Sequence, residues 1–349
     1  MSARTEDPDS KPVLIVGGGG FIGTNFTDAL LAAGVPVINL SRTWLVRRDD
    51  ARVRYVLSDD GDPDQVARLV AGAGQVFHMA HGSSLATGLQ AMEDNLTASM
   101  RLTFALMTAC AAAGVPLIYL SSGGAIYGPD VPVPTPETAP TLPISPYGAE
   151  KLTAERYLHI GAVQLGLAYR VLRISNPSGP WQLGLHGQGV IGTWMRRILN
   201  GEQIEIWGDG RVIRDYVYID DLTDALMRVR AYDGAERCFN IGSGEGHKPE
   251  RYPGADAAGL QRRPGRGGLS RGRAVACAGQ PARCRACGAR AGLARRDAAR
   301  GRDAAKLAMD EAPCFQPELI ALPWAGAKMG CILHRKLVSL IGQHFNSTQ

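Results

Sequence analysis

Tyrosine and lysine stand four residues apart in the stretch SPYGAEK, as Tyr147 and Lys151. The proline before the tyrosine predicts the start of a helix, and a spacing of four puts the two side chains on one helix face. A cation beside a phenol favours the ionised phenol, which can then accept a proton nearer neutral pH. The pair therefore predicts a tyrosine that acts as a general base.

A second motif, GGGGFIG, occupies residues 17–23 between a predicted strand and a predicted helix. Glycines allow the backbone to turn tightly beside a pyrophosphate, and the helix N-terminus offers unpaired N–H groups. Gly17, Gly20 and Gly23 have the spacing GxxGxxG, while Gly18 with the last two satisfies GxGxxG. A plain glycine-rich turn is the alternative, but the position between strand and helix favours a dinucleotide site.

The end of the second predicted strand bears on the choice of dinucleotide. An acidic residue there would accept the ribose hydroxyls of NAD, but the sequence has Leu40-Ser41-Arg42. A hydroxyl and a guanidinium suit a 2′-phosphate, so the expected cofactor is NAD or NADP, with Ser41 and Arg42 favouring NADP. If Arg42 merely lies on the surface, either dinucleotide can bind.

The elements that must position these residues alternate along the chain. Runs rich in Val, Ile and Leu predict strands at 13–16, 35–40, 53–57, 75–80, 115–122 and 168–175. Helical periodicity predicts helices at 21–33, 64–71, 93–113 and 149–166. Such alternation is typical of a parallel sheet covered on both faces. The predicted fold class is α/β, a Rossmann-like doubly wound parallel sheet followed by a small C-terminal substrate lobe.

The composition is that of a globular protein, since 45% of the 349 residues are hydrophobic and 20% are charged. No apolar run approaches the ~20 residues that span a bilayer. The polar start, residues 1–10, is expected to be a disordered leader rather than a signal peptide. The seven cysteines are an odd number without the spacing of a disulfide framework. We therefore expect a cytoplasmic protein with no membrane partner.

From about Lys11 to His247 the chain resembles the extended short-chain dehydrogenase/reductases, and among them the NAD(P)-dependent nucleotide-sugar epimerases and dehydratases typified by UDP-galactose 4-epimerase. Six motifs in order carry this resemblance: GGGGFIG, FHMAH (77–81), SSGGAIYG (121–128), SPYGAEK, RISNPSGP (173–180) and RDYVYIDDL (214–222). The resemblance implies that Tyr147 is the catalytic base and that Lys151 lowers its pKa and holds the nicotinamide ribose.

The resemblance also implies the remaining contacts. Those to the cofactor are expected from Gly17, Gly20, Phe21, Ile22, Gly23, Ser41, Arg42, Asp59 and Ala80. Asn176 and Arg214 are expected to hold the sugar–phosphate or diphosphate of the substrate. Asn176 could instead cap a turn, and Arg214 could pair with Asp215 or Asp220. His81 is as compatible with a structural role as with a functional one.

One position departs from the family pattern, and it bears on the reaction. The helper hydroxyl is expected at residue 123, which is glycine, so Ser122 is assigned this role and contact with the substrate, with Ser121 as the alternative. Sugar 4,6-dehydratases carry an Asp-Glu pair directly afterwards, as the acid and base that eliminate water. Gly124 and Ala125 stand there, which argues against dehydration.

The predicted function is therefore interconversion of the C4 epimers of a UDP-sugar through a 4-keto intermediate. A nucleotide-sugar ketoreductase that uses NADP is an alternative, and a dinucleotide-binding protein without turnover is an alternative of another class. Members of this branch usually dimerise through two helices, here 93–113 and 149–166. The stretch 204–216 resembles an edge-strand hairpin of the substrate lobe, with Trp207 in a packing role.

The chain changes character after His247. Residues 248–306 contain 15 Lys and Arg but only 4 Asp and Glu. The large apolar residues of this segment are one Tyr, three Leu and one Val, and it has no Ile, Phe, Met or Trp. Such a segment cannot bury a core. It lacks the aromatic residues of a nucleic-acid-binding arm. Its Cys284 and Cys287, with Cys277, lack a fourth ligand for a metal, so we expect neither nucleic acid nor metal.

A frameshift in GC-rich coding sequence explains this segment, because it yields Arg, Ala, Gly and Pro. Read one base later, suitable codons for 248–259 give Ser-Leu-Asn-Asp-Ile-Leu-Ala-Leu-Met-Arg-Arg-Val, an amphipathic continuation of GSGEGH like that of the family. The same shift at 287–294 gives a segment that resembles the family's late ELGW. The expected organisation is a leader (1–10), a dinucleotide-binding domain (11–175), an interleaved substrate lobe (176–247), an aberrant, poorly ordered segment (248–306) and an unassigned tail (307–349).

The nucleotide sequence around codon 248 tests the frameshift. We expect a one-base change there relative to the genes of close homologues, after which the corrected frame encodes the amphipathic helix. Close homologues that encode Lys-Pro-Glu-Arg at this point in an intact frame would contradict it.

Overall fold

The computed structural model describes residues 11–58, 62–81, 89–183, 189–200, 202, 205–207, 213–247 and 261–263. The leader, Asp59 and nearly all of the chain after His247 lie outside these ranges.

Seven parallel strands form the central sheet, in the order β10-β6-β5-β4-β1-β2-β3. Their bounds are Val13–Val16 (β1), Val37–Ser41 (β2), Val53–Leu57 (β3), Gln75–His78 (β4), Leu117–Ser122 (β5), Tyr169–Ile174 (β6) and Cys238–Ile241 (β10). The strand order reverses between β1 and β4. β1 pairs in parallel with β2 on one side and with β4 on the other. In open α/β sheets ligands bind at the carboxyl ends of the strands at such a reversal.

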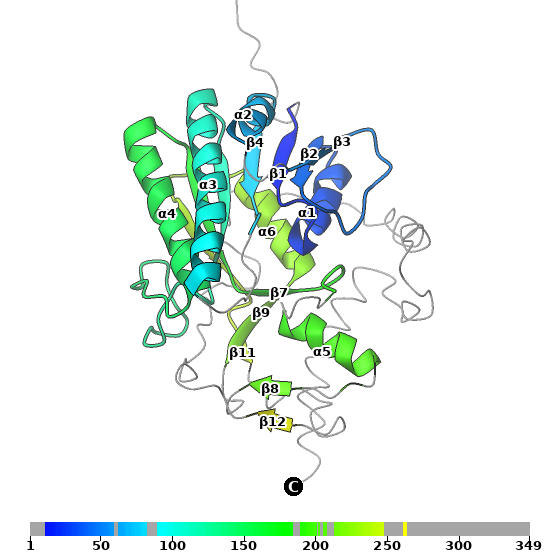
Figure 1. Ribbon diagram of the computed structural model, residues 1–349, viewed down its shortest axis with the longest axis vertical. Coiled ribbons are helices and arrows are strands. Elements are labelled where there is room, and N and C mark those ends of the chain that lie inside the picture. Colours follow the sequence, from blue (N-terminus) through cyan, green and yellow to red (C-terminus); the bar gives the residue numbers. More distant parts are fainter. Residues whose placement is uncertain are drawn as a thin grey trace, which may run out of the picture.

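Helices cover both faces of this sheet (Figure 1). α1 (Phe21–Ala32) and α6 (Ile219–Arg230) pack on one face; α2 (Pro63–Ala71), α3 (Leu89–Ala113) and α4 (Pro146–Leu165) pack on the other. β1 serves both layers, because successive side chains of a strand point to opposite faces. Val13 and Ile15 join Phe26 of α1, whereas Leu14 and Val16 join Leu106 of α3.

The predicted fold class is confirmed, and the boundaries show where local chemistry matters. α4 begins at Pro146, three residues before the predicted start, because the Ser145 side chain caps it by accepting a hydrogen bond from Gly148 N at 3.1 Å. This places Tyr147 in the first helical turn. The seventh strand, β10, and α6 both come from the range that the sequence assigns to the lobe.

The lobe lies beyond the carboxyl ends of the strands, in the lower part of Figure 1. A three-stranded sheet joins β11 (Gly246–His247), β9 (Arg214–Tyr218) and β7 (Asn176–Ser178), and α5 spans Val190–Leu199. β8 (Glu205–Trp207) pairs in parallel with β12 (Gln261–Arg263). Much of the predicted hairpin over 204–216 lies outside the described residues; within them β8 pairs with β12, and β9 pairs with β7 and β11.

One helix in the described part of the chain is long and apolar enough by composition to cross a membrane, at Met92–Ala113 within α3. The sequence predicted no apolar run long enough to span a bilayer. Core residues on α3 include Met100, Leu106 and Cys110, which pack with the strands and with Leu158 of α4. This packing is that of a core helix in an α/β domain.

A buried ion pair joins two layers of the fold and provides a test of its stability. Arg173 on β6 lies 2.7 Å from Glu155 on α4, and both side chains are less than a tenth exposed. Removing one partner leaves an uncompensated buried charge, so Glu155→Ala should lower the free energy of unfolding by about 3–5 kcal/mol in urea titrations.

The exposed pair of Asp224 with Arg228 on α6 is the matched control. Asp224→Ala should cost less than about 1 kcal/mol, because water screens exposed pairs. Equal small losses for the two variants would contradict the role given to the buried pair.

Candidate active site

The glycine turn after β1 approaches the end of β4 more closely than any side chain would allow. Gly17 has φ +88°, and a Cβ on it would lie 2.5 Å from the backbone nitrogen of Ala80. A Cβ on Gly23 would meet Gly18 at 2.5 Å, so the first turn of α1 is pressed against the loop. Backbone at such close range is what a pyrophosphate cradle requires.

The N-terminus of α1 is open to an anion. Gly20 is the N-cap, no side chain caps it, and the first turn holds no acidic residue. The backbone N–H groups of the first turn have no carbonyl partner within the helix, and the helix dipole adds positive potential. The predicted residues Gly20, Phe21, Ile22 and Gly23 thus lie where a dinucleotide pyrophosphate fits.

The middle of β2 contains a residue beside the glycine turn that sequence reasoning missed. Asn39 is 2% exposed, and its side chain lies where a Cβ on Gly18 would stand. Its amide is held on both sides: Nδ2 donates to Thr27 at 3.3 Å, and Oδ1 accepts from the Trp44 indole at 2.9 Å. An isolated polar residue within the apolar strand VPVINL was the available signal. Ser41 lies against the same loop, facing Gly19, while Arg42 is exposed.

Tyr147 and Ser122 come together at the carboxyl end of β5. The Ser122 side chain is hydrogen bonded to that of Tyr147. Burial raises the pKa of Tyr147, and the hydrogen bond to Ser122 opposes that rise. Ser121, the alternative, instead donates to Glu155 at 2.5 Å. Of the two serines, Ser122 is the one placed to assist the tyrosine.

Lys151 lies one turn after Tyr147 and is 4% exposed. Its ammonium donates to the carbonyl of Leu120 at 3.1 Å and lies 6.0 Å from the centre of the Tyr147 ring. Burial lowers the pKa of Lys151 to about 8, against the opposing effect of Glu150 and Glu155. The side chain therefore stays mostly cationic at neutral pH, as a partner of a phenolate must.

Comparison with known proteins decides the family. Residues 13–242 match the NAD dependent epimerase/dehydratase family. The chain belongs to this family.

UDP-glucose 4-epimerase of Mycolicibacterium smegmatis is 33% identical over 241 residues, which are 66% of this chain and 77% of that protein. UDP-glucose 4-epimerase of Thermotoga maritima, solved with UDP-glucose, is 32% identical with a TM-score of 0.68, over 76% of this chain and 89% of that one. The Thermus thermophilus UDP-glucose 4-epimerase, solved with NAD, is 31% identical with a TM-score of 0.66, over 76% and 90%.

Sequence reasoning missed an acidic residue, Glu150, that lies close to Tyr147 in this member of the epimerase/dehydratase family. Glu150 is 5% exposed, and its Oε1 lies 3.2 Å from Nδ1 of His81. The His81 ring meets the Tyr147 ring edge-on, with centroids 4.6 Å apart. His81 therefore belongs to the site, and Glu150, which stands inside SPYGAEK, could have been singled out as a carboxylate three residues from the base.

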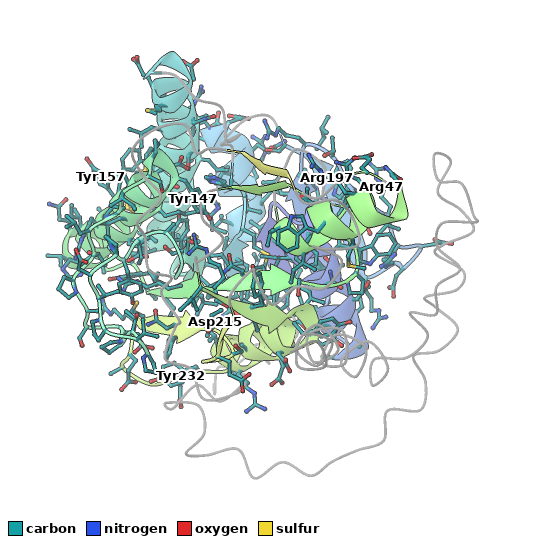
Figure 2. All side chains as sticks on the ribbon, turned by 90° about the horizontal axis from the view of Figure 1, so that it is seen from below. Arg47, Tyr147, Tyr157, Arg197, Asp215 and Tyr232 are labelled. Carbon is teal, nitrogen blue, oxygen red and sulfur yellow. The ribbon has the colours of Figure 1, made fainter. Side chains whose placement is uncertain are left out.

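The two residues predicted for the substrate lie on neighbouring strands of the lobe. The Asn176 amide donates across to the carbonyl of Asp215 at 2.8 Å, which is a bond between strands rather than a turn cap. The Asp215 carboxylate accepts from Ser243 and from Gly244 N. Arg214 has no acidic partner within the described residues, and its Nη1 donates to Ile213 O at 3.3 Å. Figure 2 views the molecule from the lobe end, with Tyr147 and Asp215 labelled.

Two of the predicted features fall on residues that the structure does not describe. Asp59, the expected adenine contact, and the cysteines of the segment 248–306 are outside the described residues. The described part contains no cluster of His, Cys, Asp and Glu that could hold a metal ion.

Two glycines with the same backbone strain test the cofactor cradle. Gly17 and Gly34 have φ +88° and +80°, but only Gly17 has atoms within reach of a Cβ. The left-handed backbone should cost each alanine variant about 1–2 kcal/mol of unfolding free energy, and Gly17→Ala should lose more because its Cβ would also collide with Ala80. Only Gly17→Ala should also weaken NAD binding, by about tenfold or more, which is a loss of about 1.4 kcal/mol.

Calorimetric titration of NAD into both variants, at a temperature where both stay folded, measures this difference. Equal affinities for NAD in Gly17→Ala and Gly34→Ala would show that the turn does not cradle the dinucleotide.

Proposed function

We propose that the protein is an NAD(P)-dependent nucleotide-sugar 4-epimerase that interconverts the C4 epimers of a UDP-sugar. The observation that carries this proposal is the group formed by Tyr147, Ser122 and Lys151, close to the glycine turn at the reversal of strand order. The family and the UDP-glucose 4-epimerases similar to the chain support it.

The chain's own residues move and hold a proton. Tyr147, as phenolate, takes the proton of the 4-hydroxyl, and Ser122 holds the sugar oxygen beside the phenol by a hydrogen bond. A dinucleotide held at the glycine turn would supply the acceptor and then the donor of the C4 hydride. After the 4-ketone has presented its other face, Tyr147 would give the proton back to its oxygen. No proton, hydride or electron pair is gained or lost overall.

Lys151 supports this step through its charge. A buried ammonium near the phenol stabilises the phenolate, and in a low-dielectric site that stabilisation is larger than in water. We assign to the same lysine the ribose of the nicotinamide, on the resemblance to the family. Since the pKa of Lys151 is about 8, the cation is present at neutral pH and is lost as the pH rises past that value.

Asn176 and Arg214 are proposed to face the nucleotide diphosphate. Arg214 carries a positive charge in the lobe, next to the strand that holds Asn176. A guanidinium offers several donors in a fork that matches phosphate oxygens. The similar Thermotoga maritima enzyme was solved with UDP-glucose, which supports a nucleotide-diphosphate sugar as the class of substrate.

The choice between NAD and NADP is left to experiment. The expectation of NADP from Ser41 and Arg42 is not supported by the similar enzyme solved with NAD. Ser41 and Arg42, however, bring no negative charge to the end of β2, so nothing at these two residues repels a 2′-phosphate. This is the observation that keeps a ketoreductase that consumes NADPH as the second candidate function.

Two other functions fit the site less well. Dehydration needs an acid and a base after the helper hydroxyl, and Gly124 and Ala125 supply neither. A dinucleotide-binding protein without turnover has no use for Tyr147 hydrogen bonded to Ser122 beside a buried lysine.

We further propose a cytoplasmic homodimer that pairs through α3 and α4. Apolar side chains lie exposed along these two helices, among them Leu96, Ile160 and Val163, the last 73% exposed. Tyr157 projects from the outer side of α4 in Figure 2 and packs edge-on against Phe104 of α3. Exposed apolar side chains on two neighbouring helices favour a protein interface there.

The frameshift also remains a proposal. The match to the family ends at residue 242, just before the change in composition at residue 248. The Mycolicibacterium smegmatis relative is matched over 77% of its length, although this chain continues to residue 349. These two observations support a coding sequence that leaves the family frame near residue 248.

Incubation with UDP-glucose or UDP-galactose, with NAD or NADP added, tests the function. We expect interconversion of the two sugars without net change in the dinucleotide. Stoichiometric consumption of NADPH with a 4-keto sugar would instead support the ketoreductase. Tyr147→Phe should lower kcat by about 10²–10⁴-fold, because it removes the general base, while NAD binding is retained.

Tyr157→Phe is the control, since it changes a tyrosine on the outer side of the same helix. It should leave kcat within about twofold of the unmodified protein, as exposed substitutions usually do. Undiminished turnover in Tyr147→Phe would remove Tyr147 as the base.

A further inference from the structure

Glu150 is a buried carboxylate for which the proposed reaction has no step. It is 5% exposed, stands three residues after Tyr147 on α4 and directly precedes Lys151. A carboxylate buried in the interior costs several kcal/mol unless it is paired. Such a cost at the catalytic pair calls for a functional reason.

Two neighbouring elements hold this carboxylate. Ser99 of α3 is hydrogen bonded to Glu150, and His81 after β4 brings Nδ1 to 3.2 Å from Oε1. The latter two atoms are in contact without the alignment of an ideal hydrogen bond, so a proton on His81 would strengthen the contact into an ion pair. The contacts lower the pKa of Glu150 although burial acts to raise it, which keeps the group ionised.

We propose that Glu150, held by His81 and Ser99, is a positioning residue whose negative charge sets the pH range over which the Tyr147–Lys151 pair works. This inference rests on the proposed function of that pair. His81 connects the carboxylate to the base sterically as well, because its ring packs edge-on against that of Tyr147.

The direction of the effect follows from Coulomb's law, since a negative charge stabilises the protonated form of every neighbour. Glu150 raises the pKa of Tyr147 and counteracts the lowering of the Lys151 pKa by burial. Ionised Glu150 thus keeps the lysine cationic, while it makes the tyrosine harder to ionise. Both ends of the working pH range lie higher than they would without this charge.

The other groups around the pair do not supply the same charge. From β4, His78 has its pKa lowered to about 3 by burial and is neutral. From β5, the pKa of Tyr119 is raised well above its ordinary value, so it is neutral too. On α4, Glu155 also raises the pKa of Lys151, but it is paired with Arg173 and only Glu150 acts on Tyr147 as well. From α3, Ser99 and Thr103 are uncharged.

The test removes the charge and keeps the shape, with Glu150→Gln. Tyr147 ionisation is followed by the ultraviolet absorbance of phenolate in the protein without substrate, after subtraction of the same titration of Tyr147→Phe. We expect the Tyr147 titration to move to lower pH, with a severalfold higher phenolate fraction below the original midpoint. Where turnover is measurable, both limbs of the kcat profile should move to lower pH.

Asp233→Asn is the charge-matched control, because it removes a negative charge from an exposed loop between α6 and β10. It should leave the titration and the profile unchanged. Because the titration needs no turnover, a protein without epimerase activity still decides the inference about Glu150.

An unshifted Tyr147 titration in Glu150→Gln would overturn the proposal and leave Glu150 a structural residue. Should Glu150→Gln fail to fold, Glu150→Asp keeps the charge but draws it back by one methylene. This variant should shift the titration in the same direction by a smaller amount, and an unchanged titration in it would likewise overturn the proposal.

Discussion

The site depends on the buried ion pair between Glu155 of α4 and Arg173 of β6. Glu155 also accepts a hydrogen bond from Ser121 of β5, and Arg173 donates to the hydroxyl of Tyr127 at 2.7 Å. Tyr127 in turn donates to Asn240 of β10 at 2.9 Å. One polar network therefore connects the helix that carries the base with three adjacent strands.

That network holds two chain segments, those of Ser122 and Tyr147, in a fixed position relative to each other. Ser121 is bound to Glu155, and the next residue, Ser122, is bound to Tyr147 eight residues before Glu155 on the same helix. Displacing α4 by a fraction of a turn would break both contacts. Burying these charges costs free energy, but their contacts fix the position of the helix relative to the strand. Sites preorganised for chemistry have this property.

The same helix shows how charge is distributed in the site. Glu150, Lys151 and Glu155 are all less than a tenth exposed, on a helix whose other buried residues are small or apolar. Glu155 has its own cation in Arg173, whereas Glu150 has a histidine whose pKa burial lowers. Lys151 is therefore a positive charge next to two carboxylates, and its pKa of about 8 is the balance of burial, which lowers it, against the carboxylates, which raise it.

Sequence patterns predicted the sheet except β10, its covering helices except α6, and the Tyr147–Lys151 pair, because period and glycine placement are local signals. They did not predict Asn39 and Glu150 as site residues. The role of each comes from what the fold brings beside it: the glycine turn for Asn39, and His81 and Ser99 for Glu150. The pairing of β8 with β12 was likewise not predicted, because it joins segments that are distant in the sequence and a local pattern does not specify such a partner.

The composition change at residue 248 affects two parts of the site differently. The seven-stranded sheet is complete with β10 at Ile241, so the glycine turn, Tyr147, Lys151 and their polar network are all encoded before residue 248. In the lobe, β9 pairs with β11 at residues 246–247, and β8 pairs with β12 at 261–263, beyond the change. Under the proposed frameshift, the altered residues lie on the side of the site that we assign to the sugar nucleotide. The side assigned to the dinucleotide keeps its sequence, so the proposal makes the two binding events separable.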